Sequence, residues 1–334
     1  MKTMGESTYS RRTFLRLTGL AGGVVALSAC AAPAAAPAAG GESAPAAGEK
    51  IQISFWTPGG SEVYCKGFGT IAQNYEALHP NIDIGDAQCG TGEQSFNEVL
   101  LARVAAGDPP DATILWTSPA AFGARNALVE LDELMANSQY SQAEAWPSGV
   151  LASCIFKGKT FGLPVAAGTY AMYYNQELFE SKGISSKRED FPKTWDELRA
   201  LSKEFTSWNG DVLESAGFIP WDEDQYTLPI WSALNGSQLY DGDNQQYLLD
   251  NEANQEMMNY AMSWLDEEYQ GDINKVNASG NWGSYVDGEG RPPAFQEGKF
   301  AIMTGGFWLA GDMYAVEPKF ERWNVASFPV GPGG

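Results

Sequence analysis

Residues 51–87 read IQISFWTPGGSEVYCKGFGTIAQNYEALHPNIDIGDA, and this stretch decides the fold. Residues 51–56 alternate and are rich in β-formers, which predicts a first strand. Pro and Gly at 58–60 break it, and an apolar face from Phe68 to Leu78 predicts a helix over 61–78. The pair His79-Pro80 ends that helix, and 82–87 predicts a second strand.

The same alternation continues after this stretch. Residues 95–106 predict a second helix and 112–116 a third strand. An order β-α-β-α-β implies a largely parallel sheet with helices on its faces, hence an α/β fold. Ligands of such sheets bind beyond the carboxyl ends of the strands, where Trp56 and Trp116 are expected. A place in the core is the alternative for each tryptophan.

Later segments carry weaker signals for further elements. Residues 161–165 and 171–175 look like a strand pair or a crossover. Thr194, with Glu197 three residues later, predicts a capped helix start. Residues 251–270 predict a long helix and 300–304 a further strand.

The N-terminus has the features of an export signal. A basic head precedes an apolar run over 17–27 that is too short to span a bilayer. SRRTFLR at 10–16 resembles a twin-arginine signal, and LSAC ending at Cys30 resembles a lipobox. We therefore expect residues 1–29 to be a signal peptide and Cys30 to carry the lipid. Residues 30–49, almost all Ala, Pro, Gly and Ser, are expected to be a linker.

Composition limits the partners. The formal net charge is −21, and without the leader, which has four basic residues and one acid, it would be −24. Such an acidic chain repels nucleic acid and anionic lipid. The 305 residues from Cys30 onward suit two domains.

The cysteines predict one disulfide and no metal site. Cys65 and Cys89 both fall just beyond predicted strand ends, so we pair them, with two buried free thiols as the alternative. Cys154 is expected to be buried and free. There is no Cys-x-x-Cys, and His79 is the single histidine, so zinc and haem have little support.

Seven segments carry a resemblance to a known family. The segments are IQISFWTPGG (51–60), LHPNIDI (78–84), VAAGDPPDATIL (104–115), FGLPVAAGTYAMYYNQELF (161–179), KTWDEL (193–198), FQEGKFAIMTGGFW (295–308) and WNVASFPVGPGG (323–334). Each segment alone is a weak signal, but their order and spacing across 51–334 make the match specific. Together they resemble the extracellular solute-binding lipoproteins of ABC importers, in the sugar-binding group that includes maltose-binding protein.

The resemblance implies a periplasmic-binding-protein-like fold of two α/β lobes with a hinge and a cleft between them. Lobe 1 would hold residues 50–167 plus about 298–334, and lobe 2 residues 168–297, including the hinge crossover. Closure about the hinge would trap a solute, and the closed monomer would dock on a membrane permease. The chain stops where the family continues through further helices, so the resemblance also implies C-terminal truncation.

Candidate ligand-binding residues follow from the chemistry of sugars and from the resemblance. Aromatic rings match the C–H faces of a sugar, and acids and amides match its hydroxyl edges. Trp308 and Tyr226 fall where family members place an aromatic residue, and Trp116 falls where they place another aromatic or polar wall. Thr169 and Tyr170 lie on the crossover. The remaining candidates, each also consistent with a core or solvated role, are Trp56, Glu62, Trp221, Trp231, Trp282 and Gly306, with Asp222 as a weaker one.

Other classes of function remain open. A solute-binding protein for a polyamine or a peptide would share the fold. A glycoside hydrolase would need two facing carboxylates. With 42 acidic residues a suitable pair can always be chosen, so their presence neither favours nor excludes a hydrolase. A surface adhesin would need no hinge. No catalytic residue, P-loop or dinucleotide motif stands out, and no cofactor is expected.

Overall fold

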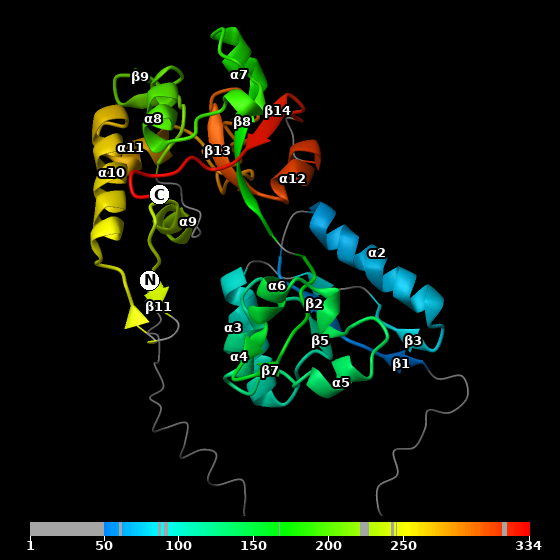
Figure 1. Cartoon of the computed structure of the whole chain (residues 1–334). Coiled ribbons are helices and arrows are strands. Elements are labelled where there is room, and N and C mark those ends of the chain that lie inside the picture. The colour runs from blue at the N-terminus through cyan, green and yellow to red at the C-terminus, as the bar shows by residue number, and fades with distance from the viewer. Residues whose placement is uncertain are drawn as a thin grey trace, which may run out of the picture. The chain divides into compact units, whose positions relative to one another are not determined.

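The computed structural model describes most of the chain after the linker (Figure 1). The described residues are 50–59, 62–85, 88–89, 93–166, 168–220, 227–241, 244, 246–315 and 319–334. The predicted signal peptide, Cys30 and the linker lie outside them.

We call residues 50–166 the first lobe, and short parallel strands form two of its sheets. β2 (Phe55–Thr57) lies between β4 (Gln88–Cys89) and β5 (Ala112–Thr113), and β1 (Ile51–Gln52) pairs with β3 (Ile82–Asp83). All three pairings are parallel, as the β-α-β-α-β order predicts. The first predicted strand is thus divided into β1 and β2.

Helices connect these strands at the predicted places. α2 (Glu62–Leu78) and α3 (Glu93–Ala106) are the two long ones. A small core of Phe96, Leu100 and Phe122 holds α3 against the sheet. The shorter elements are α4 (Pro119–Gly123), α5 (Asp132–Ala136), η1 (Ala143–Ala145), α6 (Ser148–Ala152) and the hairpin β6 (Ile155–Phe156) and β7 (Lys159–Thr160).

One carboxylate joins the beginnings of two neighbouring strands. Asp111, just before β5, accepts hydrogen bonds from the backbone N–H and the hydroxyl of Ser54, both at 2.8 Å. The bond from the Ser54 backbone, followed by that from its hydroxyl, lowers the pKa of Asp111. A carboxyl group with a lowered folded-state pKa stabilises the fold above its unfolded pKa, and this contribution disappears as the pH falls through the folded value.

We therefore expect Asp111→Asn to lower the free energy of unfolding at pH 7. The loss should stay below about 1 kcal/mol, because the carboxylate is exposed and its interactions are screened. Urea denaturation at pH 7 and at pH 3 measures it, and the difference from the parent protein should shrink at the lower pH. A difference that is constant with pH, or that equals that of the exposed control Glu98→Gln, would contradict this role.

We call the part of the chain from residue 168 onward the second lobe, and an antiparallel sheet lies at its centre. β8 (Tyr170–Asn175) pairs on one side with β13 (Ile302–Gly306) and on the other with β14 (Trp323–Ala326) (Figure 1). Two hairpins form separate small sheets, one of β9 (Ser207–Asn209) and β10 (Val212–Ser215), the other of β11 (Tyr240–Asp241) and β12 (Gln246–Tyr247).

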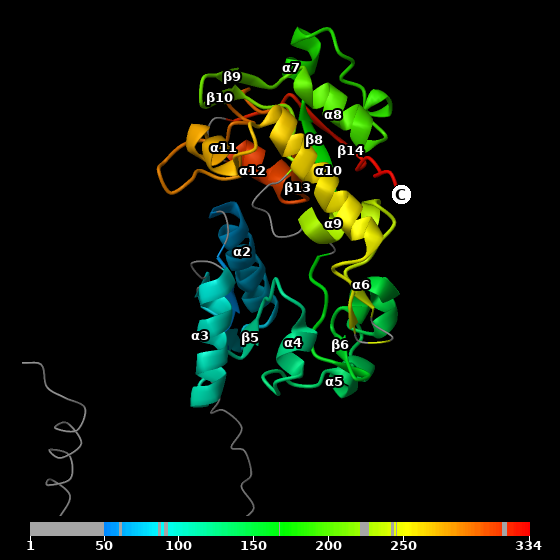
Figure 2. The same cartoon turned by 90° about the vertical axis from the view of Figure 1, so that its left-hand side faces the viewer.

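Helices pack around a large aromatic core in this lobe. α8 (Trp195–Lys203) begins at the predicted capping box of Thr194 and Glu197. α10 (Glu252–Glu268) runs beside α8, as Figure 2 shows, and the rings of Trp195 and Tyr260 lie 5.3 Å apart. The other helices are α7 (Gln176–Ser181), η2 (Arg188–Asp190), α9 (Thr227–Leu234), α11 (Ile273–Ser279) and α12 (Leu309–Ala315).

One of the two alternatives for residues 161–165 and 171–175 is not found, because 161–165 form no strand and the nearby strand pair is the β6–β7 hairpin. In the segment of about 298–334, which we expected to belong to lobe 1, β13 and β14 pair with β8, and the Trp195 indole donates to Pro329 O at 3.1 Å. Strand periodicity predicts a strand but not its neighbour, and here both edges of β8 are paired.

Candidate functional site

An aromatic pair lies beyond the carboxyl ends of β2 and β5. Trp116 follows β5 and is 44% exposed, and its indole N–H donates to the Tyr64 hydroxyl at 3.0 Å. The two rings meet edge to face, with centroids 5.8 Å apart. Phe68, one turn further along α2, contacts Tyr64 in the same manner at 4.8 Å. Sequence reasoning found Trp116 but missed Tyr64, although its place in the first turn after the break at 57–61 was a signal.

Trp56 lies within β2 and packs on α3. Its ring contacts Phe96 at 6.4 Å, and the Arg103 guanidinium carbon lies 5.4 Å from the ring centroid. Trp56 is half-buried against the small core of the first lobe. It therefore supports the sheet, and the structure does not bring it into the pair formed by Trp116 and Tyr64.

A second aromatic group lies where β8 begins and β13 ends. Tyr170 is opposite Gly306 in the ladder, and its ring meets Trp308 edge to face at 5.3 Å and 89°. Phe307, which is 52% exposed, contacts Trp308 at 5.5 Å and was missed by sequence reasoning. The preceding Gly-Gly followed by two aromatics was the available signal. Thr169 is exposed beside Tyr170.

Glycine at 306 is required by the close approach of Trp308. A Cβ atom built at Gly306 would lie 2.2 Å from the Trp308 ring, so any other residue would displace the indole. The Tyr173 hydroxyl donates to Gly306 O at 3.0 Å and fixes the strand end from the other side. Burial raises the pKa of Tyr173, which keeps this hydroxyl a donor.

Two predicted site residues belong to the interior of the second lobe. Trp231 is only 3% exposed and lies against Trp195 at 4.6 Å and Phe218 at 5.9 Å. Trp282 packs edge-on against Phe300 at 5.6 Å. Both rings therefore build the core, because α9 and the segment after α11 turn their tryptophans inward.

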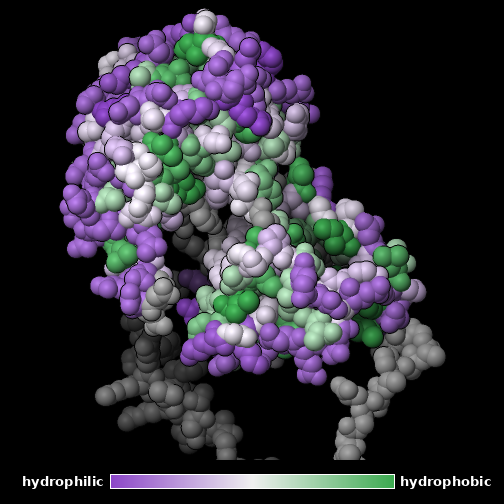
Figure 3. All heavy atoms as spheres, viewed as in Figure 1, coloured by the Kyte–Doolittle hydropathy of each residue, from purple (hydrophilic) through white to green (hydrophobic). Residues whose placement is uncertain are grey.

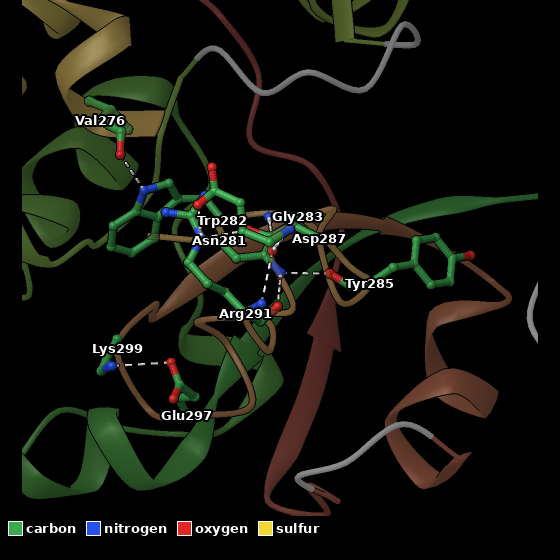
Figure 4. Close-up of polar contacts among 10 residues, drawn as sticks. Val276, Asn281, Trp282, Gly283, Tyr285, Asp287, Arg291, Glu297 and Lys299 are labelled. Atoms are coloured by element: carbon green, nitrogen blue, oxygen red, sulfur yellow. Dashed lines mark hydrogen bonds and ion pairs between the residues drawn. The ribbon is translucent and has the colours of Figure 1, made fainter. Parts of the chain in front are cut away.

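Figure 4 shows how the segment after α11 holds Trp282 in place. Its indole N–H donates to Val276 O at 2.7 Å. The amide of Asn281 donates to Tyr285 O at 2.6 Å and to Arg291 O at 2.8 Å, and Asp287 pairs with Arg291. The Tyr285 ring points away from this cluster (Figure 4). The polar groups around Trp282 are thus hydrogen-bonded within the loop and to α11.

Some candidates lie outside what the structure describes. Trp221, Asp222 and Tyr226 fall in such a segment, and the side chain of Glu62 is not described.

Cys65 and Cys89 form a disulfide, with their Cα atoms 5.9 Å apart. Cys154 is a buried free thiol. Within the described ranges, no three metal-ligating side chains come together. In that same part of the chain, no helix is long and apolar enough to cross a membrane.

The visible surface is mostly hydrophilic, with small hydrophobic patches, as expected for a chain of net charge −21 (Figure 3). Both aromatic groups carry indole or phenol rings as well as polar N–H and O–H groups. Such sites suit a neutral ligand that has apolar faces and polar edges.

Several known proteins that are named as binding proteins are similar to parts of this chain. A maltooligosaccharide ABC transporter solute-binding lipoprotein of Streptococcus pneumoniae is 27% identical over 183 residues, which cover 53% of this chain and 38% of that protein. A maltotriose-binding protein of Pyrococcus abyssi is 23% identical over 250 residues, covering 74% and 47%. The chain thus spans less than half the length of these curated relatives.

Solved structures show the same fold. CpMnBP1 with mannotriose bound matches with a TM-score of 0.68 at 24% identity, covering 85% of this chain and 70% of that one. The GacH receptor of Streptomyces glaucescens matches with 0.66 at 23%, covering 85% and 68%. These likenesses confirm the periplasmic-binding-protein-like α/β fold.

A match to a protein-family model shows the family to which the chain belongs. The model described as bacterial extracellular solute-binding protein matches residues 66–334, which is most of the chain. The chain therefore belongs to the family of bacterial extracellular solute-binding proteins.

Proposed function

We propose that this chain is the substrate-binding component of an ABC importer and reversibly captures a sugar or oligosaccharide outside the membrane. The observation that carries the proposal is the presence of two edge-to-face aromatic groups at strand ends, Trp116 with Tyr64 and Trp308 with Tyr170. The electron-rich faces of such rings suit the weakly positive C–H faces of a pyranose.

The pair in the second lobe is the main stacking surface in this proposal. Trp308 is half-buried, so its indole is partly accessible, and Tyr170 and Gly306 fix its orientation. Thr169 would supply a hydroxyl beside the rings. Trp221 and Tyr226 remain candidates of the same site.

The ligands for which two similar proteins are named, or with which they were solved, support a short oligosaccharide as the ligand. The Pyrococcus abyssi relative is named for maltotriose, and one structural neighbour holds mannotriose. A linear chain of sugars presents several C–H faces in succession, which suits more than one aromatic group. We therefore propose an oligosaccharide of glucose or mannose units as the first class of ligand to test.

The proposed delivery of the ligand to the membrane is the one expected for the family. We propose that the protein acts outside the cytoplasm, held at the membrane by a lipid on Cys30 and a flexible linker over 30–49. Residues 168–175 would form the crossover between lobes, and closure about it would present the loaded monomer to permease subunits. The ligand would be carried without chemical change.

Isothermal titration calorimetry tests the proposal. The purified protein is titrated with maltotriose, mannotriose, a mixed disaccharide panel, spermidine and a tripeptide. We expect saturable heat with at least one saccharide, and mass spectrometry should recover that saccharide intact. Heat with spermidine or the tripeptide alone would refute sugar binding, and recovery of a cleaved saccharide would point to a hydrolase.

A further inference from the structure

We propose that Tyr64 is a positioning residue that fixes the indole of Trp116, and that the disulfide Cys65–Cys89 in turn fixes Tyr64. The positioning concerns the free protein. Its consequence for ligand affinity rests on the proposed sugar-binding function.

The first step is the contact between the two aromatic side chains. Trp116 lies in the segment that follows β5, and 44% of it is exposed. An exposed side chain normally samples several rotamers. Here the indole N–H donates to the Tyr64 hydroxyl at 3.0 Å, and the rings meet at an interplanar angle of 73°. These contacts select one orientation of the indole.

The second step is how Tyr64 is held. Its ring meets Phe68, four residues later on the same face of α2, at 4.8 Å, and Phe68 contacts Phe55 of β2 at 6.1 Å. Burial raises the pKa of the Tyr64 hydroxyl, so it stays neutral at physiological pH. The acceptor of the Trp116 bond therefore does not change with pH in that range.

The third step is the disulfide. Tyr64 and Cys65 belong to the first turn of α2, and the first turn of a helix has N–H groups without intrahelical partners and frays most readily. Cys65 is bonded to Cys89 of β4, which pairs with Thr57 of β2. The cross-link therefore ties the fraying turn to the sheet at the residue next to Tyr64.

The experiment follows the indole N–H of Trp116 by ¹⁵N–¹H correlation spectroscopy, with the peak assigned by its loss in Trp116→Phe. The variants are Tyr64→Phe, which removes only the hydroxyl, and the double variant C65A/C89A. The matched control is Tyr75→Phe on the same helix, whose ring contacts His79 at 4.3 Å. Reduction of the parent protein with dithiothreitol provides a second test of the disulfide, should the double variant fail to fold.

We expect Tyr64→Phe to shift the Trp116 peak and speed its exchange with water, and Tyr75→Phe to leave it in place. Loss of the disulfide should shift the peak in the same direction. Saccharide affinity should fall about 3- to 10-fold in Tyr64→Phe, since one neutral hydrogen bond contributes on the order of 1 kcal/mol. A Trp116 peak unmoved by Tyr64→Phe, or by loss of the disulfide, would overturn the proposal.

The two proposals fail separately. If the peak shifts but no saccharide binds to the parent protein, positioning stands and the sugar function fails. If saccharides bind but the peak does not shift, the function stands and the role of Tyr64 fails.

Discussion

Replacement of Glu268 by alanine is expected to lower the free energy of unfolding by about 3–5 kcal/mol, because it breaks a buried hydrogen-bond network. Glu268 ends α10 and is 8% exposed. Its carboxyl group accepts from the Ser202 hydroxyl at 2.5 Å, from the Trp264 indole N–H at 2.6 Å and from the Thr206 hydroxyl. Removal of the acceptor leaves these donors without their partner in the core.

The network matters because it joins three separate segments. Ser202 lies near the end of α8 and also accepts the backbone N–H of Phe218 at 2.8 Å. The Tyr269 hydroxyl, whose pKa is raised well above its usual value by burial, donates to Phe218 O at 2.8 Å. The end of α8, the end of α10 and the segment at Phe218 are thus held by one set of polar contacts.

The neighbouring residue supplies a matched control. Glu267 is exposed and pairs with Arg199 at 3.0 Å and Lys203 at 3.4 Å, so Glu267→Ala should cost less than about 1 kcal/mol. Urea denaturation followed by circular dichroism compares the two variants at pH 7. Equal midpoints for Glu268→Ala and Glu267→Ala would contradict the importance of the network.

This network shows where sequence reasoning ends. The helix that carries Glu268 was predicted over residues 251–270, and the structure places it at Glu252–Glu268 with Asn251 as its N-cap. The sequence around a glutamate in that helix does not show whether its carboxylate is a buried hydrogen-bond acceptor or a solvated charge. Of its three partners, Trp264 lies one turn earlier on the same helix, but Thr206 and Ser202 are 62 and 66 residues away, so only the fold brings these two to Glu268.

The strand pairings likewise separate into those that the sequence predicts and those that it does not. The parallel pairing of β2 with β5 followed from alternation of strands and helices, because crossover connections are nearly always right-handed and local. The placement of β13 and β14 beside β8 did not follow, because it joins segments more than 120 residues apart. Local periodicity contains no information on such partners.

Whether a candidate tryptophan is accessible or buried depends on how closely it follows a predicted break in the chain. Trp308 follows Gly305-Gly306 and stays partly accessible, whereas Trp231 lies within a helix and is buried. The residue type alone did not distinguish Trp308 from Trp231. The position next to a break was the better signal, since residues there leave the hydrogen-bonded core.

Replacement of Trp308 by alanine is expected to weaken saccharide binding by about 1–3 kcal/mol, if stacking on a sugar contributes as much as stacking on a base. That loss corresponds to a roughly 5- to 150-fold higher Kd. Trp308→Phe should lose less, because a smaller ring keeps a face for stacking. Calorimetry with the saccharide that binds best measures both variants.

The control has to separate loss of the stacking surface from loss of any exposed aromatic. Tyr247 on β12 is 73% exposed and lies in a different part of the second lobe, so Tyr247→Ala should leave the Kd unchanged. Thermal unfolding of each variant must also match the parent protein, since Trp308 packs on Tyr170. If Trp308→Ala remains folded and binds saccharide as tightly as the parent, the β8–β13 aromatic group is not the stacking surface, and the pair Trp116 and Tyr64 becomes the one to test.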